Sequence, residues 1–254
     1  MEARFLDWIA ALEARHLADL RVPEVTRALR ALSSAYVERR RHPAVHTGGG
    51  HVLGALDSGG KRAAFALFYA PLHFMAVSEV VRTRSGSAPG PKTIIDVGCG
   101  TGAAGAAWAL ATQSDPAVVG IDRHPWAVQE AQWTYHYLGV RGRARQGDVT
   151  TLPRPRRGES IVAAYVLNEL PQAARTRLED RLLETASHGG GVLVIEPIAR
   201  AIAPWWDDFA ARFSSVGGRS EEWRLPIDLP PLLAKFDRAA GLNHRELTFR
   251  SLFV

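Results

Sequence analysis

The sequence has 254 residues, a length that accommodates one catalytic domain with an added helical part but leaves little room for a second full domain. Its 46% hydrophobic and 22% charged residues are typical of a packed globular protein and argue against a disordered or fibrous chain. The single cysteine, Cys99, excludes an internal disulfide framework and a cysteine-ligated zinc or iron–sulfur site within one chain, and the net charge of +5 comes mainly from arginine.

The first 85 or so residues predict helices. An amphipathic segment runs to Ala18, and its charged residues interrupt the apolar core that a signal peptide needs, so we expect a cytoplasmic protein. A second helix is expected over residues 23–41, with Pro23 in its first turn.

A long apolar helix is predicted after a break at residues 42–50. The Asp-Ser-Gly-Gly run at residues 57–60 can cap its start, and the helix continues through Arg82. Polar residues and Pro71 lie in or near the second half of the apolar stretch, which favours a buried helix kinked near Pro71 over a membrane span.

A linker rich in glycine and proline at residues 85–91 is followed by short apolar runs that alternate with helices. Strands are expected over residues 93–97, 117–122, 143–146, 161–167 and 191–196, with helices from near Ala103, Pro125 and Gln172. This βαβ repetition predicts an α/β fold with a Rossmann-like, doubly wound, mostly parallel sheet. We therefore expect a helical N-terminal subdomain over residues 1–85 and a sheet domain over residues 91–254.

The end of the chain predicts two helices and one strand. A Trp-rich helix is expected over residues 204–213, an irregular stretch around Gly217 and Gly218, and a helix over residues 230–240. A final strand is expected over residues 247–253, and the sequence assigns no partner to it.

A glycine motif follows the first predicted strand. Asp96 ends this strand, and Gly98, Gly100 and Gly102 form a Gly-x-Gly-x-Gly turn into an alanine-rich helix. A Cβ would obstruct such a turn and would keep the backbone away from a nucleotide-sized ligand. Dinucleotide-binding proteins favour Gly-x-Gly-x-x-Gly, which seats a pyrophosphate on the helix N-terminus. The spacing here favours S-adenosylmethionine, which has no phosphate, with Asp96 near its ammonium group and sugar.

Carboxylates also close the next two predicted strands. Asp122 follows the last glycine of the motif by about twenty residues, where a carboxylate can accept hydrogen bonds from both ribose hydroxyls. Asp148 can accept the adenine amino group and Val149 can pack on the ring, with Asp148 as a simple turn cap being the alternative. The carboxyl ends of parallel strands meet at one edge of the sheet, so these residues predict one binding site.

Over residues 93–196 this pattern resembles class I S-adenosylmethionine-dependent methyltransferases. The resemblance implies a cofactor site formed by Asp96, Gly98, Gly100, Gly102, Asp122, Asp148, Val149 and Asn168. It also implies that the substrate and the methyl group meet at the end of the fourth strand, at residues 165–171.

Candidate catalytic residues follow the fourth strand. Asn168 and Glu169 lie where a nucleophile must be aligned and, if it carries a proton, deprotonated. Methylases of exocyclic amines often carry Asn or Asp before two prolines and an aromatic residue, whereas Asn168 precedes Glu-Leu-Pro. Glu169 is a candidate base, with a carboxylate stabilised by a helix dipole as the alternative. Tyr69 and His73, four residues apart on the long helix, are further candidates, against the alternative of a buried, hydrogen-bonded histidine.

The helical half carries a narrower resemblance. Residues 32–36 followed by Arg39, the long apolar helix and residues 165–171 together resemble the methyltransferase-like family of small-ribosomal-subunit assembly factors, over roughly residues 22–200. This resemblance implies methylation of ribosomal RNA, with the RNA or the small ribosomal subunit as partner. The tail beyond Ile198 departs from the family pattern, and the cysteines with which some members hold an iron–sulfur cluster are absent.

Basic clusters at residues 39–42 and 154–157 could follow an RNA backbone, and Trp205 with Trp206 could offer stacking surfaces. A solvated charged face and a buried Trp pair are the alternatives. We predict an S-adenosylmethionine-dependent methyltransferase that acts on ribosomal RNA or a ribosome-associated target, without a metal site or a membrane partner. A small-molecule methyltransferase with the helical half as a lid, and a non-catalytic, cofactor-binding assembly factor, stay open.

Overall fold

The computed structural model describes residues 2–41, 56–84, 90–154 and 156–254, and of residues 35–41 the backbone only. The chain forms two compact units, of which one consists of Met1–Leu72 and Arg224–Leu247 and the other of His73–Trp223 and Thr248–Val254. A segment from near the C-terminus therefore joins the predicted helical part, which the sequence pattern did not indicate. The predicted boundary at residues 85–91 and the lid role of the helical part stay predictions.

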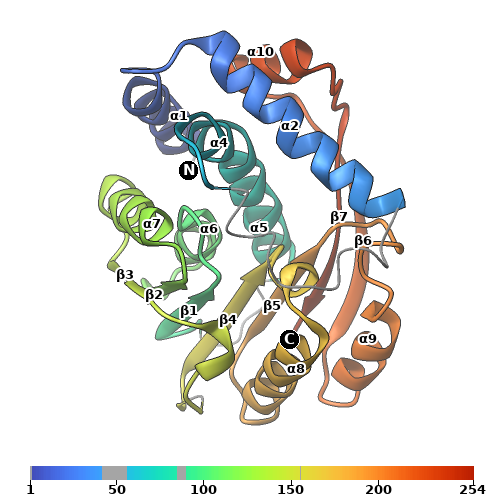
Figure 1. The fold of residues 1–254 in the computed structure, drawn as a ribbon. Helices are drawn as coiled ribbons and strands as arrows, with labels where there is room; N and C mark the ends of the chain where they lie inside the picture. Colours follow the sequence, from blue (N-terminus) through green and yellow to red (C-terminus); the bar gives the residue numbers. More distant parts are fainter. Residues whose placement is uncertain (1, 42–55, 85–89, 155) are drawn as a thin grey trace. The chain divides into compact units, whose positions relative to one another are not determined.

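The second unit contains most of a seven-stranded sheet (Figure 1). Its strands are β1 (Thr93–Val97), β2 (Ala117–Asp122), β3 (Gly142–Gln146), β4 (Glu159–Ala164), β5 (Val192–Glu196), β6 (Arg219–Pro226) and β7 (Glu246–Phe253). Their order is β3-β2-β1-β4-β5-β7-β6, with β1 to β5 parallel and β7 antiparallel to β5. The predicted doubly wound, mostly parallel sheet is confirmed.

The C-terminal strands differ from the prediction. The final strand has a partner, because Val194 of β5 pairs with Leu252 of β7. The sequence analysis missed β6 directly after the predicted irregular stretch. This strand lies at the edge of the sheet and is rich in charged and exposed residues, so it lacks the apolar alternation by which a strand is recognised.

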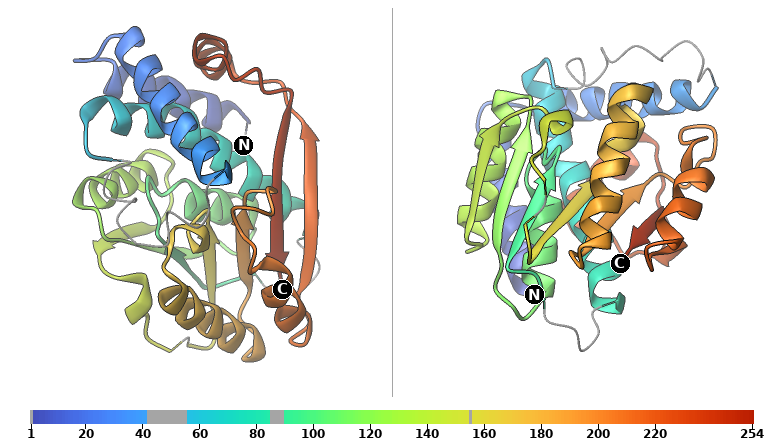
Figure 2. Two further views of the ribbon diagram at one scale, coloured as in Figure 1. Left: turned by 45° about the vertical axis from the view of Figure 1, so that its right-hand side comes forward. Right: turned by 90° about the horizontal axis from the view of Figure 1, so that it is seen from below.

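Helices cover both faces of the sheet (Figure 2). On one face lie α6 (Ala103–Ala111) and α7 (Pro125–Tyr137), and a Cβ on Gly142 of β3 would lie only 2.5 Å from Tyr135 Cγ of α7. On the other face lie α8 (Gln172–Ser187) and α9 (Trp206–Ser214), where Leu178 and Phe209 share a buried core with Ile121 and Ile161. The helix starts predicted at Ala103, Pro125 and Gln172 are confirmed.

The connection from β3 to β4 contains less helix, in its described residues, than the other connections between parallel strands. Helices α6, α7 and α8 join β1 to β2, β2 to β3 and β4 to β5, whereas the described residues between β3 and β4 form only the 3-10 turn η3 (Val149–Thr151). The strand register places Ile161, Ile95, Val119 and Arg143 in one row on the α8 face. Exposure rises along this row from the buried Ile161 to the exposed Arg143, so the β3 end of the face is open in the described structure.

The first unit is helical in the part that the structure describes, apart from the ends of β6 and β7. Its helices are α1 (Glu2–His16), α2 (Val22–Arg41), α4 (Gly59–Ala64), η2 (Phe65–Tyr69) and α10 (Pro231–Ala240). Leu12, Leu29, Leu67 and Phe236 are fully buried in it. Ser58 caps α4 by accepting the Lys61 N–H at 3.3 Å, as the Asp-Ser-Gly-Gly run predicts.

The long apolar helix is irregular beside Pro71. The segment η2 is a π-helix, in which the Ala70 N–H reaches back to the Phe65 carbonyl, and α5 (Ala70–Arg84) follows it. A proline ring crowds the carbonyl four residues before it, and a wider turn relieves that contact. The described chain has one helix long and apolar enough to cross a membrane, Gly59–Arg84, and 72% of its apolar window is buried, as in the core helix of a folded domain.

Candidate cofactor and catalytic site

The loop between β1 and α6 has the left-handed backbone that the glycine motif predicts. Gly98, Gly100 and Gly102 have φ values of 63°, 51° and 77°. A Cβ on Gly98 would lie 2.7 Å from Val166 Cγ2, and one on Gly102 would lie 2.8 Å from Tyr135 Cε1. The first and last glycines are therefore required by the packing of the protein itself, whereas the sequence analysis attributed them to obstruction of the turn and of a ligand.

Asp96 lies beneath this loop. It is 1% exposed, and its Oδ2 accepts the Gly105 N–H at 2.9 Å and the Tyr135 hydroxyl at 3.1 Å. Burial raises the pKa of Asp96 to about 7, against the lowering effect of these two hydrogen bonds. Asp96 thus anchors the start of α6, and its predicted contact with the methionine and ribose of a cofactor stays a prediction.

Asp122 ties the same loop to the end of β2. Its Oδ2 accepts the Gly100 N–H at 2.9 Å, and its Oδ1 accepts the His124 N–H at 2.8 Å. A carboxylate has about four acceptor positions, so two hydrogen bonds leave room for two ribose hydroxyls. The half-buried Asp122 thus keeps acceptor capacity, and its contact with the ribose stays a prediction.

Asp148 and Val149 follow β3 at the same edge of the sheet. Asp148 Oδ1 accepts both the N–H and the hydroxyl of Thr150 at 2.8 Å, and these bonds lower the pKa of Asp148. The turn-cap alternative for Asp148 is confirmed, and its contact with adenine stays a prediction. Val149 is buried in the same core as Ile121 and Leu152.

The chain turns sharply at the end of β4. The predicted strand over residues 161–167 ends at Ala164, because Tyr165 adopts φ 60° after its N–H bonds to the Ile195 carbonyl at 2.7 Å. A non-glycine residue in this region is strained, and such strain clusters at functional sites. The Tyr165 ring stacks on His73 of α5, with centroids 4.2 Å apart and 21° between the planes.

The two candidates from the long helix lie in different compact units. Burial of the His73 ring lowers its pKa to about 3, so the imidazole is neutral near pH 7 and a weak proton acceptor. Tyr69, at the end of η2, belongs to the first unit, where its ring lies 5.5 Å from that of Phe68. A catalytic role for either residue stays a prediction.

Asn168 and Glu169 lie on η4 (Leu167–Glu169), a 3-10 turn between β4 and α8. Glu169 precedes α8 by three residues, so it lies outside the first helical turn that the dipole alternative requires. Asn168 Oδ1 is buried and has no hydrogen-bond partner in the part of the chain that the structure describes. The turn thus presents one carboxamide acceptor and one carboxylate.

Glu196 is a functional candidate that the sequence analysis did not select. It is the last residue of β5, it is completely buried, and its Oε1 accepts the N–H groups of Leu167 and Asn168 at 2.8 and 3.3 Å. Burial raises its pKa to about 8. The signal in the sequence was a carboxylate that ends a wholly apolar strand, the same signal that identified Asp96 and Asp122.

The predicted nucleic-acid contacts are only partly described. The side chains of Arg39–Arg41 and all of His42 lie outside the described residues, whereas Arg154, Arg156 and Arg157 are exposed. Trp206 is 3% exposed and belongs to the core, as the alternative interpretation proposes. Trp205 is half-buried, with the Arg175 guanidinium 5.0 Å from its ring centroid.

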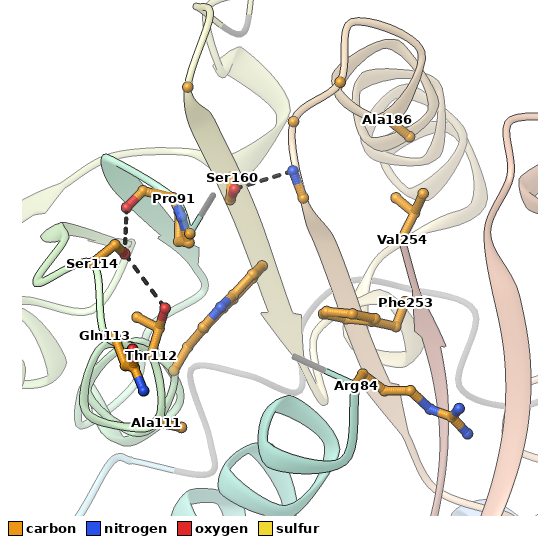
Figure 3. Close-up of a pocket in the computed structure, with 16 residues that line it drawn as sticks. Arg84, Pro91, Ala111, Thr112, Gln113, Ser114, Ser160, Ala186, Phe253 and Val254 are labelled. Atoms are coloured by element: carbon orange, nitrogen blue, oxygen red, sulfur yellow. Dashed lines mark hydrogen bonds between the residues drawn. The ribbon is translucent and has the colours of Figure 1, made fainter. Parts of the chain in front are cut away.

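A cavity of about 880 Å³ opens at the opposite edge of the sheet (Figure 3). Its lining includes Pro91, Ser114 and Ser160, which lie before or at the amino ends of β1, β2 and β4, together with Trp108 and Phe253. Ligands of open α/β sheets bind at the carboxyl ends of the strands. This cavity therefore lies away from the edge that holds Asp96, Asp122 and Asn168.

Comparison with known proteins shows a similarity to methyltransferases over part of the chain. Residues 94–190 match a family model described as a methyltransferase domain. No curated protein matches the chain. A structure described as that of an O-methyltransferase from Nostoc punctiforme aligns at 14% identity and a TM-score of 0.54, over 95% of this chain and 72% of that protein.

Two further structures are similar at 18% identity. The mitomycin 7-O-methyltransferase aligns with a TM-score of 0.51 over 96% of this chain and 71% of its own. The magnesium protoporphyrin IX methyltransferase of Synechocystis, solved with bound S-adenosylmethionine, aligns with a TM-score of 0.48 over 72% and 78%. At these identities, the similarity to the Nostoc punctiforme protein and to the mitomycin 7-O-methyltransferase shows the fold.

Proposed function

We propose that the chain, of which residues 94–190 match a methyltransferase domain, is a class I S-adenosylmethionine-dependent methyltransferase that transfers the methyl group of S-adenosylmethionine to RNA. The ribosomal RNA of the small subunit is the RNA that the resemblance of the helical half favours.

The use of two carboxylates supports the cofactor. Asp96 occupies the N–H of Gly105 at the start of α6, a donor that a pyrophosphate would otherwise use. Asp122 holds the glycine loop while keeping acceptor positions for a sugar. Such a site suits a neutral ribose and a cationic sulfonium better than a phosphate, and this arrangement is the observation that carries the proposal.

The turn after β4 supplies the remaining groups. When bound, S-adenosylmethionine would supply an electrophilic methyl group to a lone pair of the RNA, with the electron pair of the broken C–S bond left on sulfur. Asn168 aligns a proton-bearing nucleophile through Oδ1, which has no hydrogen-bond partner among the described residues. Glu169 accepts the proton that this nucleophile releases.

The distribution of charge supports RNA as the substrate. Residues 141–157 contain six arginines and one acid, Asp148, a net charge of +5 that equals the net charge of the whole chain. The remaining residues are therefore neutral overall, and the excess positive charge is concentrated in β3 and its connection to β4. Fixed positive charge that guanidinium groups concentrate in this way matches a phosphodiester backbone.

The arginines of this segment are accessible. Arg143 and Arg145 lie two residues apart on β3 and face the β3 end of the α8 face, which no helix covers in the described structure. Arg143 and Arg145 are exposed and form no ion pair within the described residues, in contrast to Arg141, which pairs with Asp115 at 3.0 Å. Unpaired guanidinium groups are available for phosphates.

The test combines binding and product formation. The double variant Arg143→Glu/Arg145→Glu should bind small-subunit ribosomal RNA more weakly, and the slope of log affinity against log salt should fall by about two units. The control Arg27→Glu/Arg238→Glu makes the same change of charge at one exposed position on each of two helices and should keep the wild-type slope. Labelled methyl groups from S-adenosylmethionine should enter RNA.

A small-molecule methyltransferase and a non-catalytic assembly factor predict different results. If the protein turns over a metabolite and binds RNA only weakly, with neither variant changing that binding, the substrate is a small molecule and not RNA. Tight, salt-dependent RNA binding and S-adenosylmethionine binding without any product would identify a binding protein.

A further inference from the structure

The hydrogen bonds between β4 and β5 continue beyond the strands through a side chain. The last main-chain bond joins the Tyr165 N–H to the Ile195 carbonyl at 2.7 Å. The first two N–H groups of η4, those of Leu167 and Asn168, bond to Oε1 of Glu196 at 2.8 and 3.3 Å. One carboxyl oxygen therefore holds the turn where Tyr165 leaves the sheet.

Burial makes this contact a strong structural constraint. Glu196 is 0% exposed, and without its oxygen two N–H groups would lose their partner. The charged groups that act on the carboxyl are Glu169, which disfavours its ionisation, and Arg175 and Arg250, which favour it. Arg250 donates its Nε hydrogen to the Pro197 carbonyl at 3.0 Å.

The turn that Glu196 holds carries the Asn168 side chain. Asn168 Oδ1 and Glu196 Oε2 are both buried without a hydrogen-bond partner in the described structure, and the Asn168 backbone N–H donates to the other oxygen of Glu196. Buried acceptors without a hydrogen-bond partner are rare in native proteins, and they indicate a functional role such as contact with a substrate.

We infer that Glu196 is the positioning residue of the transfer site, which fixes the Leu167–Glu169 turn so that Asn168 Oδ1 meets the proton-bearing nucleophile of the substrate. The inference rests on the proposed methyl transfer and adds a residue to it. Glu196 acts through Asn168 and does not touch the reacting atoms.

Hydrogen exchange on the free protein tests the constraint without a substrate. Glu196→Ala should speed exchange of the Leu167 and Asn168 amides by at least about tenfold. Glu196→Gln keeps an acceptor oxygen and should stay within roughly twofold of wild type. Glu179→Gln, a change at another buried carboxylate, on α8, should leave both amides unchanged. Unchanged protection in Glu196→Ala would overturn the inference.

A double-mutant cycle on methyl transfer to small-subunit ribosomal RNA separates positioning from general destabilisation. Glu196→Ala and Asn168→Ala should each lower kcat by about tenfold or more, with affinity for S-adenosylmethionine unchanged. Combined, they should lower it by less than roughly twofold beyond Asn168→Ala alone. Multiplying losses, or a Glu196→Gln enzyme as slow as Glu196→Ala, would reject the positioning role.

Two further results keep the tests separate. If Glu196→Ala does not fold, Glu196→Asp replaces it, because the shorter side chain withdraws the carboxyl from both N–H groups, and wild-type exchange and kcat in that variant would contradict the inference. If the wild-type protein transfers no methyl group to RNA, the proposed function fails, and the exchange experiment still decides whether Glu196 holds the turn.

Discussion

Tyr135 of α7 donates its hydroxyl hydrogen to Asp96 Oδ2 over 3.1 Å, although 39 positions separate the two residues in the chain. The same oxygen accepts the Gly105 N–H of α6, so one buried carboxyl joins β1, α6 and α7. The Tyr135 ring also fills the space beside Gly102 and Gly142. The glycine loop therefore packs against a tyrosine that no local sequence pattern relates to it.

Replacing Tyr135 by Phe should lower the free energy of unfolding by about 1–3 kcal/mol, because a buried hydrogen bond to a carboxyl is lost. The loss should be larger at pH 8.5 than at pH 5.5, since the pKa of Asp96 is about 7 and hydrogen bonds to a charged carboxylate are stronger. Urea denaturation at both pH values measures it. Tyr137→Phe, on the exposed side of the same helix, is the control and should change little.

Replacing Asp122 by Ala should weaken binding of S-adenosylmethionine by about 2–4 kcal/mol, because the acceptor for two ribose hydroxyls is removed. Asp122→Asn keeps one acceptor oxygen and should lose less. Isothermal titration calorimetry with S-adenosylmethionine and S-adenosylhomocysteine provides both values, and Asp115→Ala, at an exposed ion pair with Arg141, should bind like wild type. Equal affinity in Asp122→Ala would contradict the assigned site.

Two alanine substitutions separate backbone strain from steric conflict at glycines with positive φ. Gly139 has φ 66°, and no atom lies within 4 Å of the position that a Cβ would take there, so Gly139→Ala should cost about 1–2 kcal/mol of stability from strain alone. Gly98 has φ 63° and a Cβ there would lie 2.7 Å from Val166, which should add about 1–3 kcal/mol of overpacking. Chemical denaturation of both variants gives the difference, and equal losses would show that Val166 yields without cost.

Glu196 should make stability fall as pH rises. Its pKa is about 8 in the folded protein and near 4.5 when unfolded, so between these values the folded state binds more protons and loses stability with each step in pH. Glu196→Gln removes this dependence. The unfolding free energy of Glu196→Gln relative to wild type should therefore increase between about pH 5 and 8, by at most about 1.4 kcal/mol per pH unit. A flat difference would show that Glu196 is ionised throughout.

Local patterns accounted for much of the parallel sheet. The bounds predicted for β1 and β2 agree with the structure, because each is a short apolar run with an aspartate at or next to its end, before a turn or helix. The end of β4 was predicted three residues too late, since the apolar run continues through Tyr165 while the backbone turns there. The stack of Tyr165 on His73 joins residues that no pattern relates.

What the sequence determined by itself was the order of elements, the glycine loop and the edge where the carboxylates meet, because strand periodicity and turn chemistry are properties of neighbouring residues. Tertiary structure alone decided how those carboxylates are used. In the folded protein, Asp96 accepts hydrogen bonds from α6 and Tyr135, and Asp122 keeps free acceptor capacity. Glu196 accepts the backbone N–H of Asn168. Each of these outcomes depends on which distant N–H or hydroxyl a buried oxygen meets, and that is fixed only when the strands and helices pack.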